Sequence, residues 1–262
     1  MPLKWSDYLQ FREELQSKYR YFRTEWASGY LAALKRTCKK RIAIITQDTE
    51  LWRSRLEGSL VPCSQDDFAI EAYSCDEMAA PPPDLSRASR IGVTGIPVLY
   101  LSSDKDTAMS EVRPWKNQPV TLAKCHPTKD LNIVDCQQTG LDGTIADLDK
   151  LWPPASSLMP KEIIPDSEQE VRAWAWIDYA FSEPVSQLDP PLEYIPTQVI
   201  AEFFKTEGYD GIKYRSSVAL GYNVALFDVN AAKILETMLY YTNDICYRFS
   251  RTQFVSGGKR EQ

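Results

Sequence analysis

The segment from residue 87 to residue 114 constrains the fold of this chain more than any other. A Gly/Pro turn leads into a short apolar run, which predicts a strand over residues 97–102. Asp104 or Asp106 can cap a helix that follows this strand, and this helix carries one acidic residue, Glu111, before a proline ends it. A cation, a strand-borne tyrosine and a carboxylate thus fall in one short stretch, and such a set can bind a phosphate, stack on a ring and stabilise a sugar cation.

Apolar periodicity and turn residues predict a mixed series of elements along the rest of the chain. Strands are expected over residues 41–46, 50–56, 97–102, 118–125, 130–136, 211–216, 222–227 and 245–249. Helices are expected over residues 5–36, in the stretch that ends at Pro114, over residues 169–181, and over residues 198–206 with Thr197 as the cap and Gly208 at the end. Residues 58–86 and 137–167 are expected to be loops. The mixed order favours the α+β class.

The N-terminal segment is rich in aromatic residues that recur every three or four positions, which predicts one long helix over residues 5–36. Two interpretations are open. The helix docks on its own domain, which we favour, or it binds a partner or a second copy of the chain. We therefore divide the chain into a helical extension, residues 1–40, and a main domain, residues 41–262.

Composition excludes several classes of function. The net charge of −6 and the pI of about 5.1 argue against general nucleic-acid binding, which needs a basic surface. No metal site is expected, because His126 is the only histidine and no Cys-x-x-Cys pair occurs. The same scarcity of histidine disfavours a Ser-His-Asp triad, and the glycine-rich loops of dinucleotide and P-loop sites are missing from the sequence. No apolar run is long enough for a spanning helix and no signal pattern opens the chain, so a cytoplasmic location is the default expectation.

Two pairs of arginines are candidates for binding an anion. Arg53 and Arg55 alternate along a predicted strand, so their guanidinium groups share one face. Arg87 and Arg90 precede the turn that enters the 97–102 strand, where they could clamp a phosphate. In each case a solvated surface charge is the alternative.

The other candidate residues are a carboxylate, two tyrosines and two serines. Glu111 is either a surface residue or the group that stabilises an oxocarbenium-like centre. Tyr100 is either a core aromatic or a side chain that stacks on a ligand ring. Tyr214 leads into Ser216 and Ser217, whose hydroxyls either bind ribose or phosphate or shape the turn.

Taken together, these segments resemble the RES-domain family, which is named for Arg, Glu and Ser. The matching pieces, in the family's order, are Leu51-Trp-Arg-Ser-Arg-Leu56, Glu77-Met-Ala-Ala-Pro-Pro-Pro83, Arg87-Ala-Ser with Gly95-Ile-Pro-Val-Leu-Tyr-Leu101, Thr107-Ala-Met-Ser-Glu-Val-Arg-Pro114, Tyr194-Ile-Pro-Thr-Gln198, and Gly208-Tyr-Asp-Gly-Ile-Lys-Tyr-Arg-Ser-Ser217 with Gly221-Tyr-Asn-Val-Ala-Leu-Phe227. The resemblance spans residues 45–250 and leaves out the N-terminal helix.

The resemblance implies roles for individual residues. Arg53 is the family's Arg, Glu111 its Glu and Ser216 its Ser, with Ser217 as a close rival. Arg87 corresponds to a second family Arg, although the family's Gly-Arg-x-Asn setting reads Ser86-Arg-Ala-Ser89 here. Serine therefore replaces both the Gly and the Asn of the family's setting.

The resemblance also implies a fold and an activity. Family members are similar to ADP-ribosyltransferases, so an ADP-ribosyltransferase-like mixed sheet with flanking helices is expected. They act on NAD as a substrate, and many are bacterial toxins paired with an Xre-like antitoxin. The expected function is cleavage of the nicotinamide–ribose bond of NAD by hydrolysis or phosphorolysis. The alternatives are ADP-ribosylation of a protein and a module that binds NAD or ADP-ribose without turnover.

Overall fold

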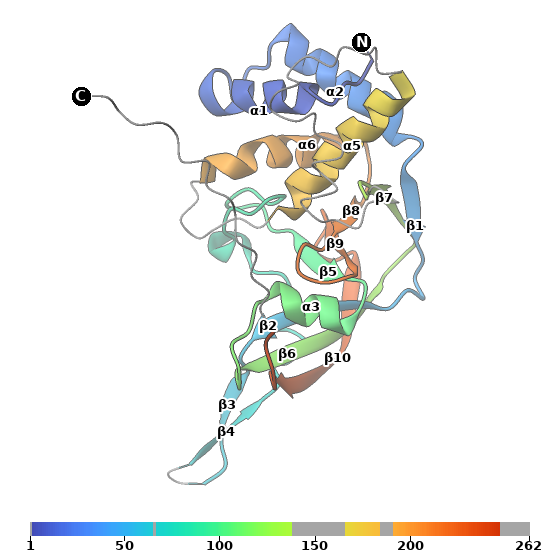
Figure 1. The fold of residues 1–262 in the computed structure, drawn as a ribbon. Helices are drawn as coiled ribbons and strands as arrows, with labels where there is room; N and C mark the ends of the chain where they lie inside the picture. Colours follow the sequence, from blue (N-terminus) through green and yellow to red (C-terminus); the bar gives the residue numbers. More distant parts are fainter. Residues whose placement is uncertain (1, 65–66, 138–165, 184–190, 247–262) are drawn as a thin grey trace, which may run out of the picture.

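The computed structural model describes residues 2–64, 67–137, 166–183 and 191–246 (Figure 1). Its centre is a mixed sheet in the order β1-β7-β8-β9-β5-β2-β6-β10. The strands are β1 (Ile42–Ile45), β2 (Leu51–Leu56), β5 (Leu99–Ser102), β6 (Pro119–Pro127), β7 (Leu131–Asp135), β8 (Gly211–Arg215), β9 (Tyr222–Leu226) and β10 (Ala232–Tyr241). Only the β7–β8 pair is parallel among these neighbours, and the other pairs are antiparallel. The α+β class is therefore confirmed, as are the strands predicted between residues 41 and 227.

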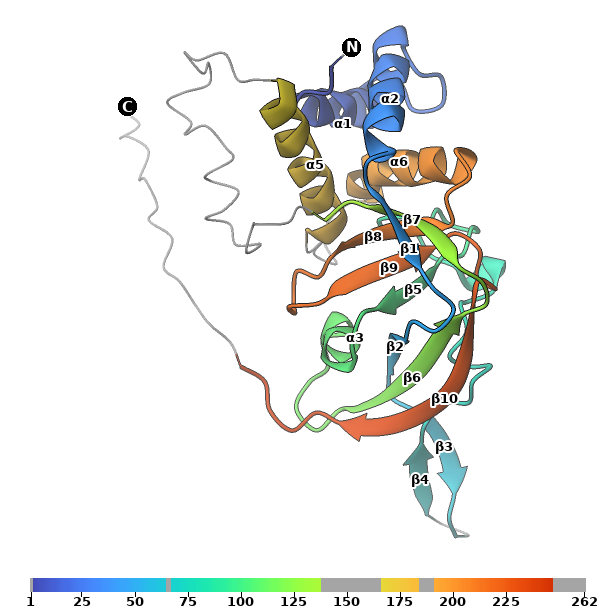
Figure 2. The same ribbon diagram turned by 90° about the vertical axis from the view of Figure 1, so that its right-hand side faces the viewer.

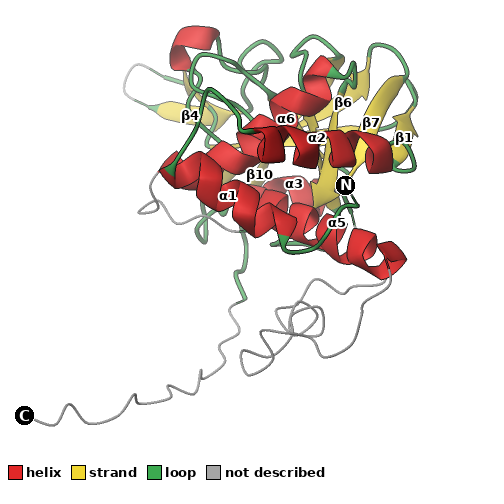
Figure 3. Cartoon of the chain, turned by 90° about the horizontal axis from the view of Figure 1, so that it is seen from above, coloured by secondary structure: helices red, strands yellow, loops and turns green. Residues whose placement is uncertain are grey.

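Four helices pack together at one end of the sheet, and a fifth lies apart from them (Figures 1 and 3). The four are α1 (Asp7–Ser17), α2 (Glu25–Cys38), α5 (Asp166–Ser182) and α6 (Ile195–Thr206). The fifth, α3 (Lys105–Glu111), lies beside β2 and β5 (Figure 2). Phe11, Tyr30, Trp174 and Phe204, from the four packed helices, are fully buried in one cluster. None of the described helices is long and apolar enough to cross a bilayer.

The prediction of a single N-terminal helix is wrong, because α1 and α2 are separated by residues 18–24. Thr24 starts the second helix as its N-cap, and its hydroxyl accepts a hydrogen bond from the Ala27 amide at 3.1 Å. Tyr19 and Phe22 continue the aromatic period but are 55% and 89% exposed. The aromatic repeat in the sequence is therefore longer than the stretch of α1 that is buried. Both helices bury their apolar sides in the main core, as the docked interpretation predicts.

The predicted loop over residues 58–86 contains a hairpin instead. Strands β3 (Ser59–Pro62) and β4 (Phe68–Glu71) pair antiparallel and project from the body, and a short turn of 3-10 helix, η1 (Pro83–Leu85), follows (Figures 1 and 2). Leu60 and Phe68 are 69% and 62% exposed. Because the hairpin buries little apolar surface, its sequence lacks the apolar pattern by which a core strand is recognised.

The prediction of a strand over residues 245–249 is wrong for residues 245 and 246, which the structure describes. Ile245 and Cys246 are not in a strand, and residues 247–249 lie outside the described residues. The edge strand is β10, which pairs with β6. A register shift between Ile234 and Glu236 interrupts its alternation, which explains why the sequence pattern does not reveal it.

The helix predicted to start after Thr197 begins earlier. α6 starts at Ile195 with Pro196 in its first turn, and Thr197 lies inside it, donating its hydroxyl to the Tyr194 carbonyl at 2.9 Å. Gly208 follows the helix with a φ of +88°, as the predicted terminator should. Most of the loop predicted over residues 137–167 lies outside the described residues.

Replacing Phe11 by alanine should lower the free energy of unfolding by about 3–5 kcal/mol, because the ring is fully buried in the common core. Phe22→Ala, at an exposed position close in sequence, should change it by less than about 0.5 kcal/mol. Denaturant unfolding followed by circular dichroism measures both. A separate early transition, with the main transition unmoved in Phe11→Ala, would show that α1 is not part of the core.

Candidate active site

A cleft of about 540 Å³ opens between the sheet and the helices. This volume is in the range that small-molecule sites occupy. Its walls come from β2, β5, β8 and β9, from the end of α3, from the end of α5, and from the short 3-10 helix η3 (Pro191–Tyr194). The lining residues include Arg53, Arg90, Tyr100, Glu111, Tyr214 and Ser217, so residues far apart in the sequence meet here.

Glu111 is the last residue of α3, and its carboxylate is held by two neutral side chains. Its Oε1 accepts hydrogen bonds from Ser216 Oγ at 2.7 Å and from Asn223 Nδ2 at 2.6 Å. The Asn223 amide is itself oriented, because its Oδ1 accepts a hydrogen bond from Ser102 Oγ at 2.8 Å. Within the described part of the chain, Oε2 receives no hydrogen bond, which leaves one oxygen of a fixed carboxylate available in the cleft.

Ser216 and Ser217 have different surroundings. Ser216 is buried, and its hydroxyl oxygen accepts hydrogen bonds from the amides of Val218 and Ala219 at 3.2 and 3.1 Å. The hydroxyl hydrogen is therefore directed to Glu111. Ser217 is exposed and lines the cleft. The structure thus places Ser216 as a support of the carboxylate and Ser217 at the surface that a ligand would meet.

Two half-buried arginines line the cleft without a carboxylate within ion-pairing distance among the described residues. Arg53 donates from Nε to the Met78 carbonyl at 2.8 Å and from Nη1 to the Tyr100 carbonyl at 3.1 Å. Arg90 donates from Nη1 to the Ala180 carbonyl at 2.8 Å. Burial lowers the pKa of both guanidinium groups, which nevertheless stay charged at neutral pH. Each retains N–H groups that form no hydrogen bond in the described structure.

The other two arginines predicted for the anion site are not in the cleft. Arg87 is exposed and does not line it, whereas Arg90 does. Arg55 lies on the same side of β2 as Arg53, as alternation predicts, but it donates to the Glu77 carbonyl and packs over the Tyr73 ring at 4.9 Å. Its side chain is therefore engaged outside the cleft.

Both predicted tyrosines line the cleft. The hydroxyls of Tyr100 and Ser89 lie 2.6 Å apart, and burial raises the pKa of Tyr100. Tyr214 is buried, which raises its pKa too, and its ring centroid lies 6.0 Å from that of Phe181. Both rings stay neutral at physiological pH and provide apolar surface beside the cations.

A further arginine, Arg215, lines the cleft but is neutralised. Its Nε lies 3.2 Å from Oδ2 of Asp178, a residue that is almost wholly buried. Asp178 also accepts a hydrogen bond from the Arg215 amide at 3.2 Å. This pair joins the end of β8 to α5, whereas Arg53 and Arg90 form no ion pair within the described residues.

Several lining residues were missed by reading the sequence, among them Ser54, Ser102, Tyr194 and Asn223. One of them carried a signal. Asn223 is a polar residue in the apolar strand Tyr222–Leu226, and a buried polar side chain needs a specific partner. The others have no local signature, since their place in the cleft depends on strand register and loop shape.

Asp104 fixes the helix that carries Glu111, which decides between the two predicted caps. Its carboxylate accepts hydrogen bonds from the Thr107 amide at 2.8 Å, the Thr107 hydroxyl at 2.8 Å and the Ser103 hydroxyl at 2.6 Å. Burial alone would raise the pKa of Asp104, but these hydrogen bonds outweigh it and the pKa is lowered. The charged form therefore stabilises the fold.

The sequence matches a protein-family profile, and the structure was compared with solved structures. A profile of the family described as the RES domain matches residues 70–249. The solved structure is the M. tuberculosis MbcT-MbcA toxin-antitoxin complex, with 11% sequence identity, a TM-score of 0.35, and coverage of 79% of this chain and 91% of that one. A search of curated proteins finds no match.

Replacing Asp104 by alanine should lower the free energy of unfolding by about 1–2 kcal/mol at neutral pH, through loss of the cap. Because the pKa of Asp104 is lowered in the folded state, its contribution is present above the unfolded pKa of about 3.9 and is lost as the pH falls through the folded value. The difference between wild type and variant, measured by denaturant titration, should be constant above about pH 5 and shrink below about pH 4. A difference that does not depend on pH would show that the charge of Asp104 is not involved.

Proposed function

The chain belongs to the RES domain family, and we propose that it is an enzyme that consumes NAD by cleaving the bond between nicotinamide and ribose. One observation carries the proposal. A carboxylate fixed by two hydrogen bonds, Glu111, lines the same cleft as Arg53 and Arg90, two cations that form no ion pair within the described residues. A dinucleotide offers what this arrangement lacks, a diphosphate for the cations and a developing positive charge for the carboxylate.

The two arginines are suited to the diphosphate. Burying a guanidinium costs desolvation free energy, and without a paired carboxylate no ion pair offsets that cost. A bound anion would supply this interaction. Arg53 and Arg90 are anchored by main-chain carbonyls through some of their N–H groups, and the remaining ones can donate to phosphate oxygens. We therefore assign diphosphate binding to Arg53 with Arg90, in place of Arg87.

Glu111 acts on the reacting centre. As the glycosidic bond breaks, its electron pair leaves with nicotinamide, which departs as a neutral molecule and requires no general acid. Positive charge develops at the ribose anomeric carbon, and a carboxylate beside it lowers the energy of that state. Ser216 and Asn223 hold Oε1, so Oε2 is the oxygen directed to the sugar. Tyr100 supplies ring surface for the nicotinamide end.

Water, inorganic phosphate or a protein side chain then adds to the sugar cation. The first two give ADP-ribose or its phosphate ester, and the third gives an ADP-ribosylated protein. Family membership supports a toxin or effector, and an enzyme that depletes NAD would require a cognate antitoxin or immunity protein to protect the cell that makes it. A cleft that binds NAD without turnover is the competing function.

Glu111→Gln should reduce the rate of nicotinamide release from NAD by about 100-fold or more, because the amide cannot stabilise the sugar cation. Glu236→Gln, at an exposed position on β10, is the matched control and should leave the rate unchanged. Chromatography with and without phosphate identifies the product along with the rate. Wild-type protein that binds NAD and releases no nicotinamide would establish a binding module instead, and full turnover in Glu111→Gln would remove Glu111 from the mechanism.

Arg87 and Arg90 give a second test of the proposed function. Arg90→Ala should weaken NAD binding by roughly tenfold or more, since a charge-assisted hydrogen bond contributes about 1.5–3 kcal/mol. Arg87→Ala, three residues away and exposed, should change it by less than about twofold. Isothermal titration with NAD measures both. The opposite ranking would restore Arg87 to the site and contradict the assignment made from the cleft.

A further inference from the structure

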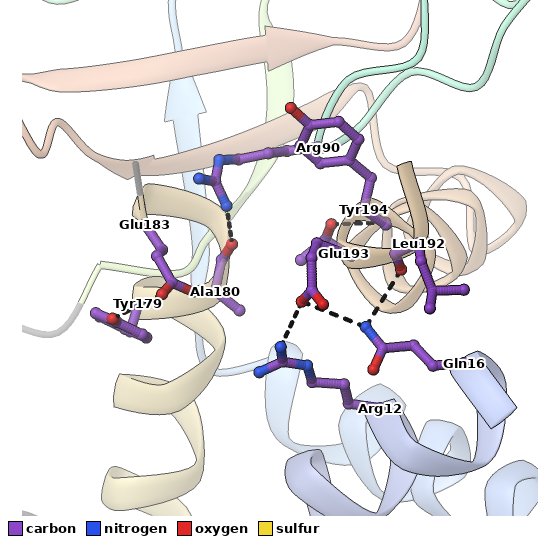
Figure 4. Close-up of polar contacts among 10 residues, drawn as sticks. Arg12, Gln16, Arg90, Tyr179, Ala180, Glu183, Leu192, Glu193 and Tyr194 are labelled. Atoms are coloured by element: carbon purple, nitrogen blue, oxygen red, sulfur yellow. Dashed lines mark hydrogen bonds and ion pairs between the residues drawn. The ribbon is translucent and has the colours of Figure 1, made fainter. Parts of the chain in front are cut away.

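One wall of the cleft is held from outside by the first helix of the chain (Figure 4). Tyr194, the last residue of η3, lines the cleft, and α6 begins immediately after it. α1 lies against η3 and α6 on the side away from the sheet (Figures 1 and 4). The family profile matches residues 70–249, and α1 lies outside the matched stretch.

Two side chains of α1 bind η3 directly. The Arg12 guanidinium forms an ion pair with the Glu193 carboxylate, the residue next to Tyr194. One helical turn later, Gln16 Nε2 donates to the Leu192 carbonyl at 3.2 Å and to Glu193 Oε2 at 3.4 Å. Because residues four apart share one helix face, α1 presents both groups to η3 at once.

Apolar packing places α1 where these contacts can form. Tyr8, Phe11 and Leu15 are buried in the core cluster that also contains residues of α5 and α6. Burial raises the pKa of Tyr8, and the charges of Glu183 and Arg90, both lining the cleft, act on it as well. α1 therefore lies close to the charged residues of this wall as well as to η3.

The wall behaves as one unit because its parts are tied to each other. Gln198, in the first turn of α6, donates from Nε2 to the carbonyls of Ser89 at 2.8 Å and Gly92 at 3.1 Å. Arg90 lies between these two residues and donates to the Ala180 carbonyl of α5. A displacement of η3 and the start of α6 would thus be transmitted to the loop that carries Arg90.

We propose that α1 is a brace that sets the affinity of the cleft for its ligand, with Arg12 and Gln16 as positioning residues for Tyr194 and Arg90. With NAD as the ligand, this proposal rests on the proposed function. The brace acts on binding and not on bond cleavage. In the described residues, the groups that hold Glu111 come from β9 and from the end of β8, and none comes from α1.

The test compares variants of the full chain. Arg12→Gln and Glu193→Gln each break the ion pair, and the double variant Arg12→Glu with Glu193→Arg restores it with the charges exchanged. Lys18→Gln is the matched control, because it breaks an exposed ion pair with Glu13 that lies within the N-terminal segment and does not contact η3. Amide hydrogen exchange over residues 191–198 reports the brace, and steady-state kinetics of nicotinamide release report its effect on the site.

The expected result is faster exchange over residues 191–198 in both single variants, together with a rise in KM of roughly three- to tenfold and a kcat within about twofold of wild type. The charge-exchanged variant should recover both values, and Lys18→Gln should change neither. Exchange and KM that do not move in the single variants would overturn the proposal, as would a fall in kcat at unchanged KM. Wild-type protein without NAD turnover would refute the proposed function, and exchange alone would then decide whether α1 braces the wall.

Discussion

The arrangement of this cleft depends on two guanidinium groups that the fold half-buries and that form no ion pair with a carboxylate of the described residues. Arg53 and Arg90 are held by carbonyl oxygens of Met78, Tyr100 and Ala180, which accept their hydrogen bonds but carry no negative charge. The charge of Glu183 acts on Arg90 without forming an ion pair with it. The contrast with Arg215, which the buried Asp178 neutralises in the same cleft, shows that the fold does provide a counter-charge where an arginine is structural. Two cations that form no ion pair within the described residues favour an anion as the ligand of this cleft.

The carboxylate at this site depends on contacts between distant parts of the chain. α3 is fixed at its start by Asp104, and its last residue, Glu111, is held by Ser216 after β8 and by Asn223 on β9. Ser102 and Asn223 face each other in the β5–β9 register, so pairing of these strands orients the amide that holds Glu111. Shifting that register by one residue would turn Asn223 to the other face of the sheet.

The sequence predicts the parts of this site that local signals define. Periodicity and turn residues locate the strands and α3, and a motif resemblance identifies Arg53, Glu111 and Ser216, which the structure brings together. The choice between Arg87 and Arg90 could not be made in this way, because both are arginines of one loop and only its folded shape decides which enters the cleft. The break between α1 and α2 was missed because the aromatic repeat continues through residues that are exposed in the folded chain. Strand β10 was missed because its pairing with β6 includes a register shift that interrupts the alternation.

The two halves of the cleft are built from different parts of the fold, and this separation has a consequence. The Glu111 carboxylate is held by α3, by the residue that follows β8 and by β9, whereas the wall with Arg90 and Tyr194 is held by α5, α6, the loop before β5, and α1. A change in the helical layer can therefore alter how firmly a ligand is held while the geometry around Glu111 stays the same. Within the described residues, α1 contacts this wall and contributes none of the groups that hold Glu111, so under the proposed function it can adjust affinity without disturbing the chemistry.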